Sequence, residues 1–233
     1  MVSVRTFLSV AVAKGWDIYQ LDVHNAFLHG DLEEEVYMHF PLGFSVGSPG
    51  SACKLQRSLY GLKQSPRNWF AKLRDSLLNF GFQQSKADYT LFTFTRDQDF
   101  VAVLIYVDDI LLAGNNKSAC DQVKIHLSSC FKIKDLGKLK YFLGIEFARS
   151  SSGIFLSQRK FAMDILHECG LLGCKPYDFP MDQNHKLALA DGPAYDDATR
   201  YRRLVGCLLY LTITRPELSY AVHTLSQFLQ HPL

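Results

Sequence analysis

The chain has 233 residues, and its 48% hydrophobic and 21% charged content is that of an ordinary folded globular protein with one large or two small domains. Its longest apolar stretches are too short to span a membrane. Its six cysteines form neither a CxxC pair nor a disulfide-type cluster, which favours reduced thiols and an intracellular protein, and no His or Cys spacing indicates zinc.

Helical and extended patterns alternate over the first part of the chain. Apolar residues that recur every three or four positions predict helices, and short apolar runs between turn residues predict strands. The N-terminal segment could be read as a signal peptide, but its spacing fits a helix better. The predicted elements are a helix over 3–14, strands over 16–23 and 35–38, a loop over 41–51, a helix from Ser65 to Gly81, strands over 89–95, 100–106 and 110–114, and a helix from about 117 to 130.

The last third of the chain has a different character. A hairpin is predicted where "YFLGIEFA" and "GIFLSQ" flank the turn "RSSSG", and a helix follows over 158–169. Residues 171–197 are rich in Pro, Asp and Gly, which predicts a linker. Two helices end the chain, over about 198–212 and from "TRPE", where Thr214 and Glu217 have capping-box spacing. The predicted fold class is α+β, with an antiparallel sheet and helices on one side.

Basic residues concentrate in two segments although the net charge is only +2. Residues 51–74 contain six basic residues and no acidic one, and residues 117–140 contain six against Asp121 and Asp135. Such segments suit a phosphate-rich ligand. Solvated helix faces are the alternative, and this observation alone favours them.

Two adjacent carboxylates, Asp108 and Asp109, interrupt the apolar run "AVLIYVDDILLAG". If the flanking segments are strands, both carboxylates lie at a hairpin tip, and a third, Asp22, ends the strand "IYQLDV". Carboxylates at the edge of an apolar sheet suit Mg²⁺, which keeps waters for substrate phosphates. Two such ions could activate a 3′-hydroxyl and stabilise a leaving pyrophosphate. The alternative is two good turn residues, but the tetrad from Tyr106 to Asp109 between apolar strands favours the metal site.

Six ordered motifs of the chain resemble the reverse transcriptase of copia-type LTR retrotransposons, and the resemblance covers essentially the whole sequence. It implies a polymerase palm over 1–147 with partial fingers elements, the YVDD hairpin and the start of the primer grip. It further implies a connection hairpin, helix and linker over 148–197 and a small thumb-like helical region over 198–233. The motifs are "QLDVHNAFLHGDLEEEVYM", "LQRSLYGLKQSPRNWF", "ADYTLF", "LIYVDDILLAG", "DLGKLKYFLGIE" and "YRRLVGCLLYLTITRPELSYAV".

The resemblance implies an RNA-directed DNA polymerase that uses two Mg²⁺ ions, with Mn²⁺ as a substitute. Asp22 and Asp108 would hold both metals, and Asp109 would be a weaker or outer ligand. The backbone through Asn25 and Ala26 would lie against the incoming triphosphate.

The same resemblance assigns a residue to sugar selection. Phe27 would exclude ribonucleotides by steric overlap with their 2′-hydroxyl. A core aromatic is the alternative for Phe27.

The remaining motif residues would contact nucleotide, template and primer. Tyr60 and Gly61 would line the nucleotide and template side, together with Ser65 and Pro66, and Gly61 would allow close backbone approach. Lys63 is better interpreted as a template or structural lysine.

Two further motifs would contact the primer. Leu143 and Gly144 would form the turn of the primer-grip hairpin. On the thumb-like helix, Gly206 would permit close approach to the duplex and Tyr210 would contact sugar, with a helix–helix contact as the alternative for Gly206.

By the same resemblance, the partners are an RNA or DNA template with its primer, deoxynucleoside triphosphates and other retroelement polyprotein parts, with no membrane. The location would be intracellular, in the cytoplasm or a virus-like particle. The family's basic fingers segment and ribonuclease H domain are not recognisable within the 233 residues, so we expect weak primer–template binding and poor extension. The alternative is a non-catalytic retroelement remnant that at most binds nucleic acid; the three intact aspartates favour the polymerase.

Overall fold

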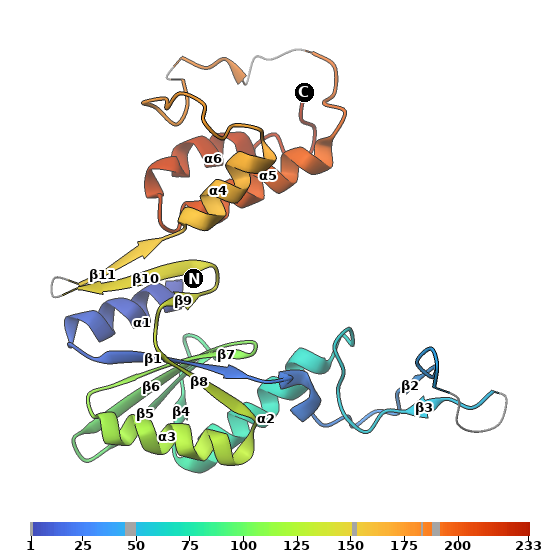
Figure 1. Cartoon of the computed structure of the whole chain (residues 1–233), viewed down its shortest axis with the longest axis vertical. Helices are drawn as coiled ribbons and strands as arrows, with labels where there is room; N and C mark the ends of the chain where they lie inside the picture. Colours follow the sequence, from blue (N-terminus) through green and yellow to red (C-terminus); the bar gives the residue numbers. More distant parts are fainter. Residues whose placement is uncertain (1, 45–49, 151–152, 183, 188–191) are drawn as a thin grey trace. The chain divides into compact units, whose positions relative to one another are not determined.

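The computed structural model of the protein describes residues 2–44, 50–150, 153–182, 184–187 and 192–233 (Figure 1). The chain forms two compact units, Met1–Leu139 and Lys140–Leu233. Both units combine helices with antiparallel strands, which confirms the predicted α+β class. Parts of the predicted loop over 41–51, the turn "RSSSG" and the linker over 171–197 lie outside the described residues.

The first unit contains the helices and strands that the apolar patterns predict, together with one 3-10 helix and three strands that they do not predict. The unpredicted strands carry few apolar residues; they are β3 (Cys53–Lys54), β4 (Gln83–Gln84) and β8 (Ile133–Lys138). The elements are α1 (Val2–Ala13), β1 (Asp17–Val23), η1 (Ala26–His29), β2 (Tyr37–Met38), β3 (Cys53–Lys54), α2 (Ser65–Phe80), β4 (Gln83–Gln84), β5 (Leu91–Arg96), β6 (Asp99–Tyr106), β7 (Asp109–Gly114), α3 (Lys117–Cys130) and β8 (Ile133–Lys138).

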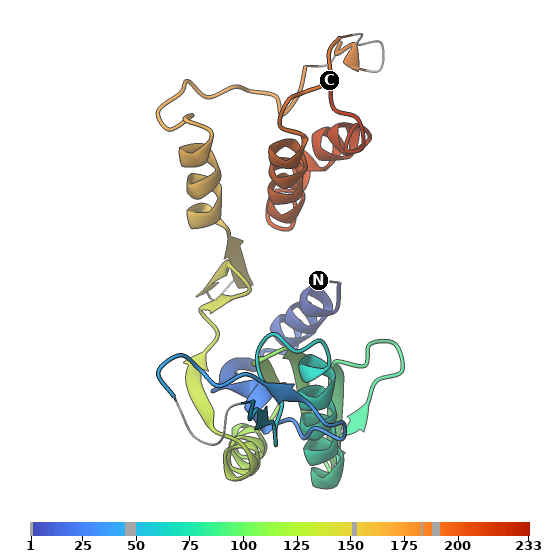
Figure 2. The same ribbon diagram turned by 90° about the vertical axis from the view of Figure 1, so that its right-hand side faces the viewer.

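A six-stranded antiparallel sheet of strand order β4-β5-β6-β7-β1-β8 forms the centre of this unit. Successive side chains of a strand point to opposite faces, so alternate residues of β1, β6 and β7 build one apolar face. Leu21, Val103 and Leu112 on this face are buried against Leu73 of α2 and Val123 of α3. The two helices therefore cover one face of the sheet, as Figure 2 shows.

Helix α1 lies on the other face, which corrects the prediction that helices cover only one side (Figures 1 and 2). Its buried residues Val4, Phe7, Leu8 and Ala11 have the predicted helical spacing. A second apolar set, which includes Leu104 and Leu111, is buried on this face as well.

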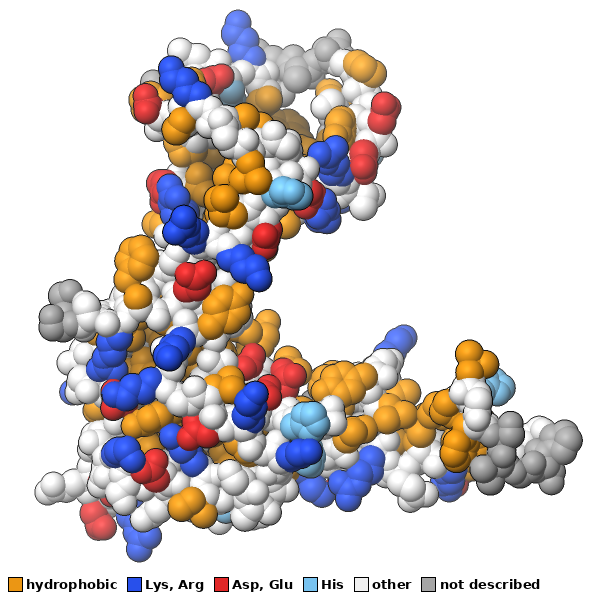
Figure 3. All heavy atoms as spheres, in the orientation of Figure 1, with side chains coloured by type: hydrophobic (Ala, Val, Ile, Leu, Met, Phe, Trp, Pro, Cys, Tyr) orange, Lys and Arg blue, Asp and Glu red, His pale blue; other side chains and the backbone are white. Residues whose placement is uncertain are grey.

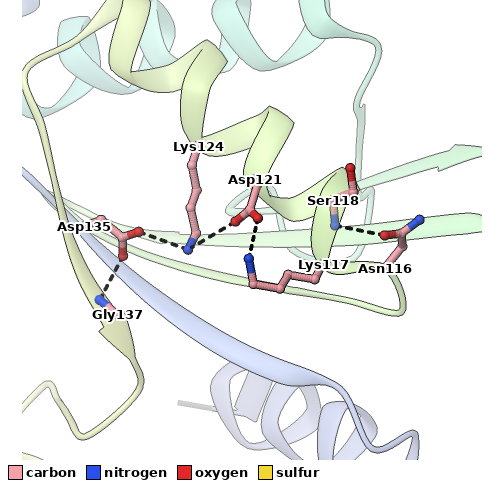
Figure 4. A network of polar contacts seen from close by, with 7 residues as sticks. All are labelled: Asn116, Lys117, Ser118, Asp121, Lys124, Asp135 and Gly137. Atoms are coloured by element: carbon pink, nitrogen blue, oxygen red, sulfur yellow. Dashed lines mark hydrogen bonds and ion pairs between the residues drawn. The ribbon is translucent and has the colours of Figure 1, made fainter.

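Helix α3 is tied to the edge strand β8 by a polar network (Figure 4). Lys124 forms ion pairs with Asp135 of β8 at 3.0 Å and with Asp121 at 3.8 Å, and its Nζ lies 3.7 Å from the ring centroid of Tyr19 on β1. The same carboxylate of Asp135 accepts a hydrogen bond from the backbone N–H of Gly137. These contacts fix the edge strand that lies next to β1.

Helical spacing predicts a buried stripe of Ala119, Val123, Leu127 and Cys130 on α3, and the structure corrects one of these four residues. Ala119, Val123 and Leu127 are buried as predicted, but Cys120 takes the fourth place and Cys130 is exposed. Burial raises the pKa of the Cys120 thiol to about 11, so this cysteine is an unreactive core residue. Asn116 caps the helix by accepting a hydrogen bond from the N–H of Ser118.

The second unit holds a small sheet of order β11-β10-β9 and helices around it. Phe142, Ile145 and Phe147 of the sheet are buried, as are Val205 and Leu211 of α5. The elements are β9 (Tyr141–Phe142), β10 (Ile145–Ser150), β11 (Gly153–Ser157), α4 (Arg159–Glu168), α5 (Ala198–Leu211), η3 (Pro216–Leu218) and α6 (Ser219–Ser226). None of the described helices of the chain is both long and apolar enough to cross a membrane.

The predicted capping box at "TRPE" does not form. Arg215 precedes the 3-10 helix η3 without a side-chain cap, and α6 begins only at Ser219. The Thr214 hydroxyl instead donates a hydrogen bond to the side chain of Gln158, and Glu217 pairs with Arg215. A long-range partner therefore replaces the local one that the spacing predicted.

Candidate active site

The three predicted carboxylates come together at one end of the central sheet. Asp22 of β1 lies directly opposite Asp109 of β7 in the antiparallel pair. Asp108 lies in the two-residue turn between β6 and β7, and its backbone carbonyl accepts a hydrogen bond of 2.9 Å from the N–H of Val23. Opposite residues of an antiparallel pair point to the same face, so Asp22 and Asp109 share one face of the sheet.

Asp22 and Asp109 belong to a row of side chains that runs across four neighbouring strands. Tyr106 of β6 lies opposite Asp109, and Lys134 of β8 lies opposite Asp22. Tyr106 and Lys134 are both exposed, and the two carboxylates between them are partly exposed. This end of the sheet therefore presents an accessible row with two carboxylates at its centre.

The turn that carries Asp108 has an unusual backbone. Val107 has φ +56°, a left-handed conformation that β-branched residues rarely adopt. The indole Nε1 of Trp69 on α2 donates a 2.7 Å hydrogen bond to the Val107 carbonyl, and Trp69 is only 1% exposed. A rigid core side chain thus holds the strained turn in place. The sequence motifs gave no indication of this contact.

Negative charge accumulates around these carboxylates. Burial is the main cause that raises the pKa of Asp109, and the neighbouring charges of Asp108 and Asp22 raise it further. A hydrogen bond of 3.0 Å from Nε2 of buried Gln20 opposes the shift. The pKa of Tyr60 is also raised, by burial and then by the charges of Asp108 and Asp22. A bound cation would relieve this repulsion.

We expect Asp109→Asn to raise the thermal midpoint of unfolding by a few degrees at pH 7. The carboxyl pKa is raised in the folded state, so the unfolded chain loses this proton first and folding becomes less favourable as the pH rises through that window. Asn imitates the protonated acid and can still accept from Gln20. Scanning calorimetry of both proteins between pH 3 and pH 7 measures the difference, which should vanish below the ordinary pKa of Asp. An equal difference at every pH would contradict this assignment.

The residues predicted to bind nucleotide gather beside Asp22 and Asp108. Asn25 adopts φ +52° and opens the short helix η1, in which Ala26 is fully buried. The ring of Phe27 lies 4.5 Å from that of Tyr60, and the Tyr60 side chain interacts with the backbone of Ala26. Phe27 is also partly buried against the core. Its ring therefore has a core contact, as the alternative interpretation of this residue predicts, in addition to its contact with Tyr60. Tyr60 is 56% exposed and forms the accessible wall of this group.

Four other predicted residues lie on the loop into α2 or at its start. Gly61 has φ +96° and open space around its Cα, so glycine is needed there for its backbone conformation. Ser65 is buried, and its hydroxyl donates to the Leu59 carbonyl at 2.6 Å. Pro66 follows in the first helical turn, and Lys63 is exposed. The loop is therefore built by Gly61 and Ser65, and Lys63 is accessible.

The remaining predicted residues belong to the second unit. Leu143 and Gly144 form the turn between β9 and β10, with φ +49° and +76°. The Tyr210 hydroxyl donates to the Leu143 carbonyl, and its ring packs edge-on against Phe161 at 5.0 Å. A Cβ at Gly206 would meet no atom within 4 Å, so no close helix contact requires this glycine. Tyr210 thus supports the turn of Leu143 and Gly144.

Ion pairs neutralise much of the two basic segments. Lys54, Lys72 and Arg74 pair with nearby carboxylates in the first segment, as do Lys117, Lys124 and Lys138 in the second. These six residues fit the alternative of solvated surface pairs. Lys63 and Lys134 have no ion pair with a described residue, so their charge is available to a ligand.

The carboxylates fit a divalent ion only as a partial ligand set. The described part of the chain holds no group of three or more His, Cys, Asp or Glu that could bind a metal ion by itself. Mg²⁺ in phosphate-handling sites is commonly held by one or two carboxylates together with substrate phosphates and water. Asp22 and Asp108, from two strands that the sheet brings together, supply hard oxygen ligands of this type.

Comparisons with known proteins match nearly the whole chain. A family model for reverse transcriptase (RNA-dependent DNA polymerase) matches residues 1–183. The chain is 46% identical over 231 residues to the "Retrovirus-related Pol polyprotein from transposon RE1" of Arabidopsis thaliana, covering 99% of this chain and 16% of the relative. It is 37% identical over 244 residues to that from transposon TNT 1-94 of Nicotiana tabacum, covering 100% and 18%.

A yeast relative is matched over more of its length. The putative transposon Ty5-1 protein of Saccharomyces cerevisiae is 33% identical over 215 residues, which cover 91% of this chain and 70% of that protein. The two plant relatives are far longer, and the chain spans less than a fifth of each.

Proposed function

Since the chain belongs to the reverse transcriptase (RNA-dependent DNA polymerase) family of copia-type retrotransposon Pol polyproteins, we propose that it carries the nucleotidyl-transfer site of such a polymerase. The observation that carries the proposal is the pairing of Asp22 with Asp109 beside the turn of Asp108. Carboxylates that converge at an accessible sheet edge suit the transfer of a nucleotide from a triphosphate to a 3′-hydroxyl.

We assign Asp22 and Asp108 as the residues that would hold two Mg²⁺ ions, with Asp109 as the outer ligand. When bound, such ions supply charge neutralisation at the triphosphate and lower the pKa of the attacking hydroxyl. The protein's part is to hold the carboxylates in position. The hydrogen bond from Trp69 to the turn and the bond from Gln20 to Asp109 serve this purpose.

The neighbouring group of Ala26, Phe27 and Tyr60 is the proposed nucleotide site. The rings of Phe27 and Tyr60 adjoin each other, and Tyr60 lies close enough to Asp22 and Asp108 for their charges to affect its pKa. A sugar placed between these rings and the carboxylates would meet Phe27 at its 2′ side. Asn25 and Gly61 supply the left-handed backbone that shapes the two borders of this site.

The finer fold assignment belongs to the same proposal. The central sheet with α2 and α3 would serve as the palm, the turn at Leu143 and Gly144 as the primer grip, and the helices α5 and α6 as a thumb-like region. Lys63, Gly206 and Tyr210 would contact template or primer. The partners would be a primed RNA or DNA template, deoxynucleoside triphosphates and other polyprotein parts, within the cytoplasm or a virus-like particle.

RNA-templated addition of a single deoxynucleotide to a labelled DNA primer tests the proposal. With protein in excess over primer–template and at low salt, weak binding does not mask the chemical step. We expect one added nucleotide that is complementary to the template, that requires Mg²⁺ or Mn²⁺ and that EDTA abolishes. Primer–template binding without any addition would favour the second candidate, a non-catalytic remnant that only binds nucleic acid.

Phe27→Ala should relax discrimination against ribonucleotides. The smaller side chain leaves room for the 2′-hydroxyl, while the backbone of η1 is unchanged. We expect the ratio of deoxynucleotide to ribonucleotide addition to fall at least about 10-fold, which corresponds to ~1.4 kcal/mol of lost discrimination. Single-nucleotide addition with each triphosphate measures the ratio, and Phe70→Ala, which truncates another partly buried aromatic packed on the same core, is the control. An active Phe27→Ala protein with unchanged selectivity would assign Phe27 to the core.

A further inference from the structure

We propose that the free edge of β11, together with the cavity at the start of α4, is a docking site for an extended peptide segment of a protein partner. The segment would carry an apolar side chain followed by an acidic one. This inference lies outside the polymerase function, because it concerns a protein surface of the second unit and uses none of the residues assigned to catalysis.

The first observation is the open edge of the small sheet. Within the described residues, β11 pairs with β10 alone and forms the edge of the order β11-β10-β9. Every second residue of an edge strand turns its backbone N–H and C=O groups outward. The segment "GIFLS" has no charge and no Pro, the usual means of blocking such an edge, and Phe155 at its centre is 70% exposed. Another extended chain can therefore add to this edge.

The second observation is a cavity of about 400 Å³ where β11 runs into α4. Phe155, Leu156, Met163 and Leu211 give it apolar walls, and Gln158 and Arg159 lie at the junction of strand and helix. Figure 3 shows hydrophobic, basic and acidic side chains side by side on this face of the second unit. The cavity continues directly from the end of β11. One side chain of an added strand could therefore enter it.

The third observation is an unsatisfied polar group beside this cavity. Gln158 is only 3% exposed, and its Oε1 accepts the hydroxyl of Thr214 at 2.8 Å. Its Nε2 is buried and has no hydrogen-bond partner within the described residues. Buried amide groups are nearly always paired, so a missing acceptor here needs an explanation. A backbone carbonyl of an added strand would supply that acceptor.

Charge decides between a foreign peptide and a second copy of β11. Arg159 is exposed at the start of α4 and has no ion pair with a described residue, whereas Arg215 pairs with Glu217. An acidic side chain next to the apolar one would meet Arg159. The segment "GIFLS" of a second β11 has no acidic side chain that could pair with Arg159. The surface therefore favours an acidic partner over self-association.

Fluorescence anisotropy with the complete 233-residue chain tests the proposal. The probe is the labelled peptide TVTVLEVT, whose alternating residues favour an extended strand and whose Leu-Glu pair matches the cavity and Arg159. We expect saturable binding that weakens at least ~10-fold when Glu is replaced by Lys. Binding should be lost when the two Thr residues before Leu are replaced by Pro, which cannot donate a backbone hydrogen bond. Equal binding of all three peptides, or of none, would overturn the proposal.

Variants of the chain separate docking from folding. Gln158→Leu removes the unpaired amide, so it should weaken peptide binding ~10-fold, whereas Thr214→Val, which removes only the hydrogen bond between these two side chains, should leave peptide binding unchanged. Arg159→Glu should reverse the preference and favour the Lys peptide. Phe155→Lys places a charge on the edge and should abolish binding, whereas Tyr177→Lys, an exposed aromatic elsewhere in the unit, should not. Unchanged binding in Gln158→Leu and Arg159→Glu, or a dimer in sedimentation that Phe155→Lys dissociates, would contradict the assignment.

Discussion

Replacing either Asp22 or Asp108 by Asn should lower templated single-nucleotide addition at least about 100-fold, which corresponds to ~2.7 kcal/mol of activation free energy. Asn keeps the size of Asp and its hydrogen-bonding oxygen but removes the charge that a divalent cation requires. Both side chains are partly exposed, so the fold does not depend on their charge. The thermal midpoint should therefore stay within a few degrees of the wild-type value, or rise slightly as charge repulsion is relieved.

Asp121→Asn is the matched control for this pair of variants. Asp121 is a half-buried aspartate of the same unit whose partners are Lys117 and Lys124 of α3. Asp121→Asn removes the same charge at a position outside the row of Asp22 and Asp109. Nucleotide addition should therefore be unchanged. If Asp22→Asn and Asp108→Asn kept wild-type rates while Mg²⁺ remained essential, the ions would be held elsewhere.

Trp69→Ala should lower the free energy of unfolding by ~3–5 kcal/mol, the usual range for a buried aromatic truncated to Ala. Trp69 is fully enclosed in the core, where its ring packs edge-on against Phe131 at 5.1 Å. Trp69→Ala should disturb more than core packing, because the indole also holds the strained turn at Val107 by a hydrogen bond. Denaturant unfolding gives the stability, and single-nucleotide addition per folded molecule gives the effect on the site.

Trp69→Phe and Leu73→Ala separate the two roles of this side chain. Phe retains most of the packing but cannot donate to the Val107 carbonyl, so we expect only about 1 kcal/mol of lost stability together with a clear loss of nucleotide addition. Leu73 is buried on the same helix and contacts the core alone, so Leu73→Ala should cost ~2–5 kcal/mol without lowering the rate per folded molecule. A Trp69→Phe protein with full activity would show that the turn holds its shape without the indole.

The central part of the first unit could be predicted because local pattern and tertiary structure agree there. The segments of β6 and β7 are apolar runs on both sides of a short polar turn, and the start and end of α2 are marked by Pro66 and Gly81. The convergence of Asp22 with the Asp108 turn followed from strands that each end in a carboxylate. The register that sets Asp22 opposite Asp109 depends on side-chain packing and backbone pairing, which the sequence pattern does not specify.

The features that escaped prediction depend on contacts between distant residues. The segment "IKDLGK" of β8 has little apolar alternation, and it is held as a strand by pairing with β1 and by the ion pair of Lys124 with Asp135. Thr214 and Glu217 have the spacing of a capping box, but buried Gln158 competes for the Thr214 hydroxyl. The contact between Trp69 and Val107 joins a helix to a turn and leaves no local signal. Gln20 did leave a local signal in the sequence, because it is an amide side chain within an apolar strand.

Iron-mediated cleavage of the backbone tests most directly whether Asp22 and Asp108 form one cation site. Fe²⁺ would replace Mg²⁺ in the full chain with bound primer–template and a triphosphate, and ascorbate with peroxide would generate hydroxyl radicals at the ion. A shared cation site predicts two cuts, near residue 22 and near residues 108–109, which excess Mg²⁺ suppresses. Asp108→Asn should weaken both cuts together, and Asp121→Asn neither. Cleavage at only one of these segments, or independent loss of the two cuts, would contradict a shared cation site.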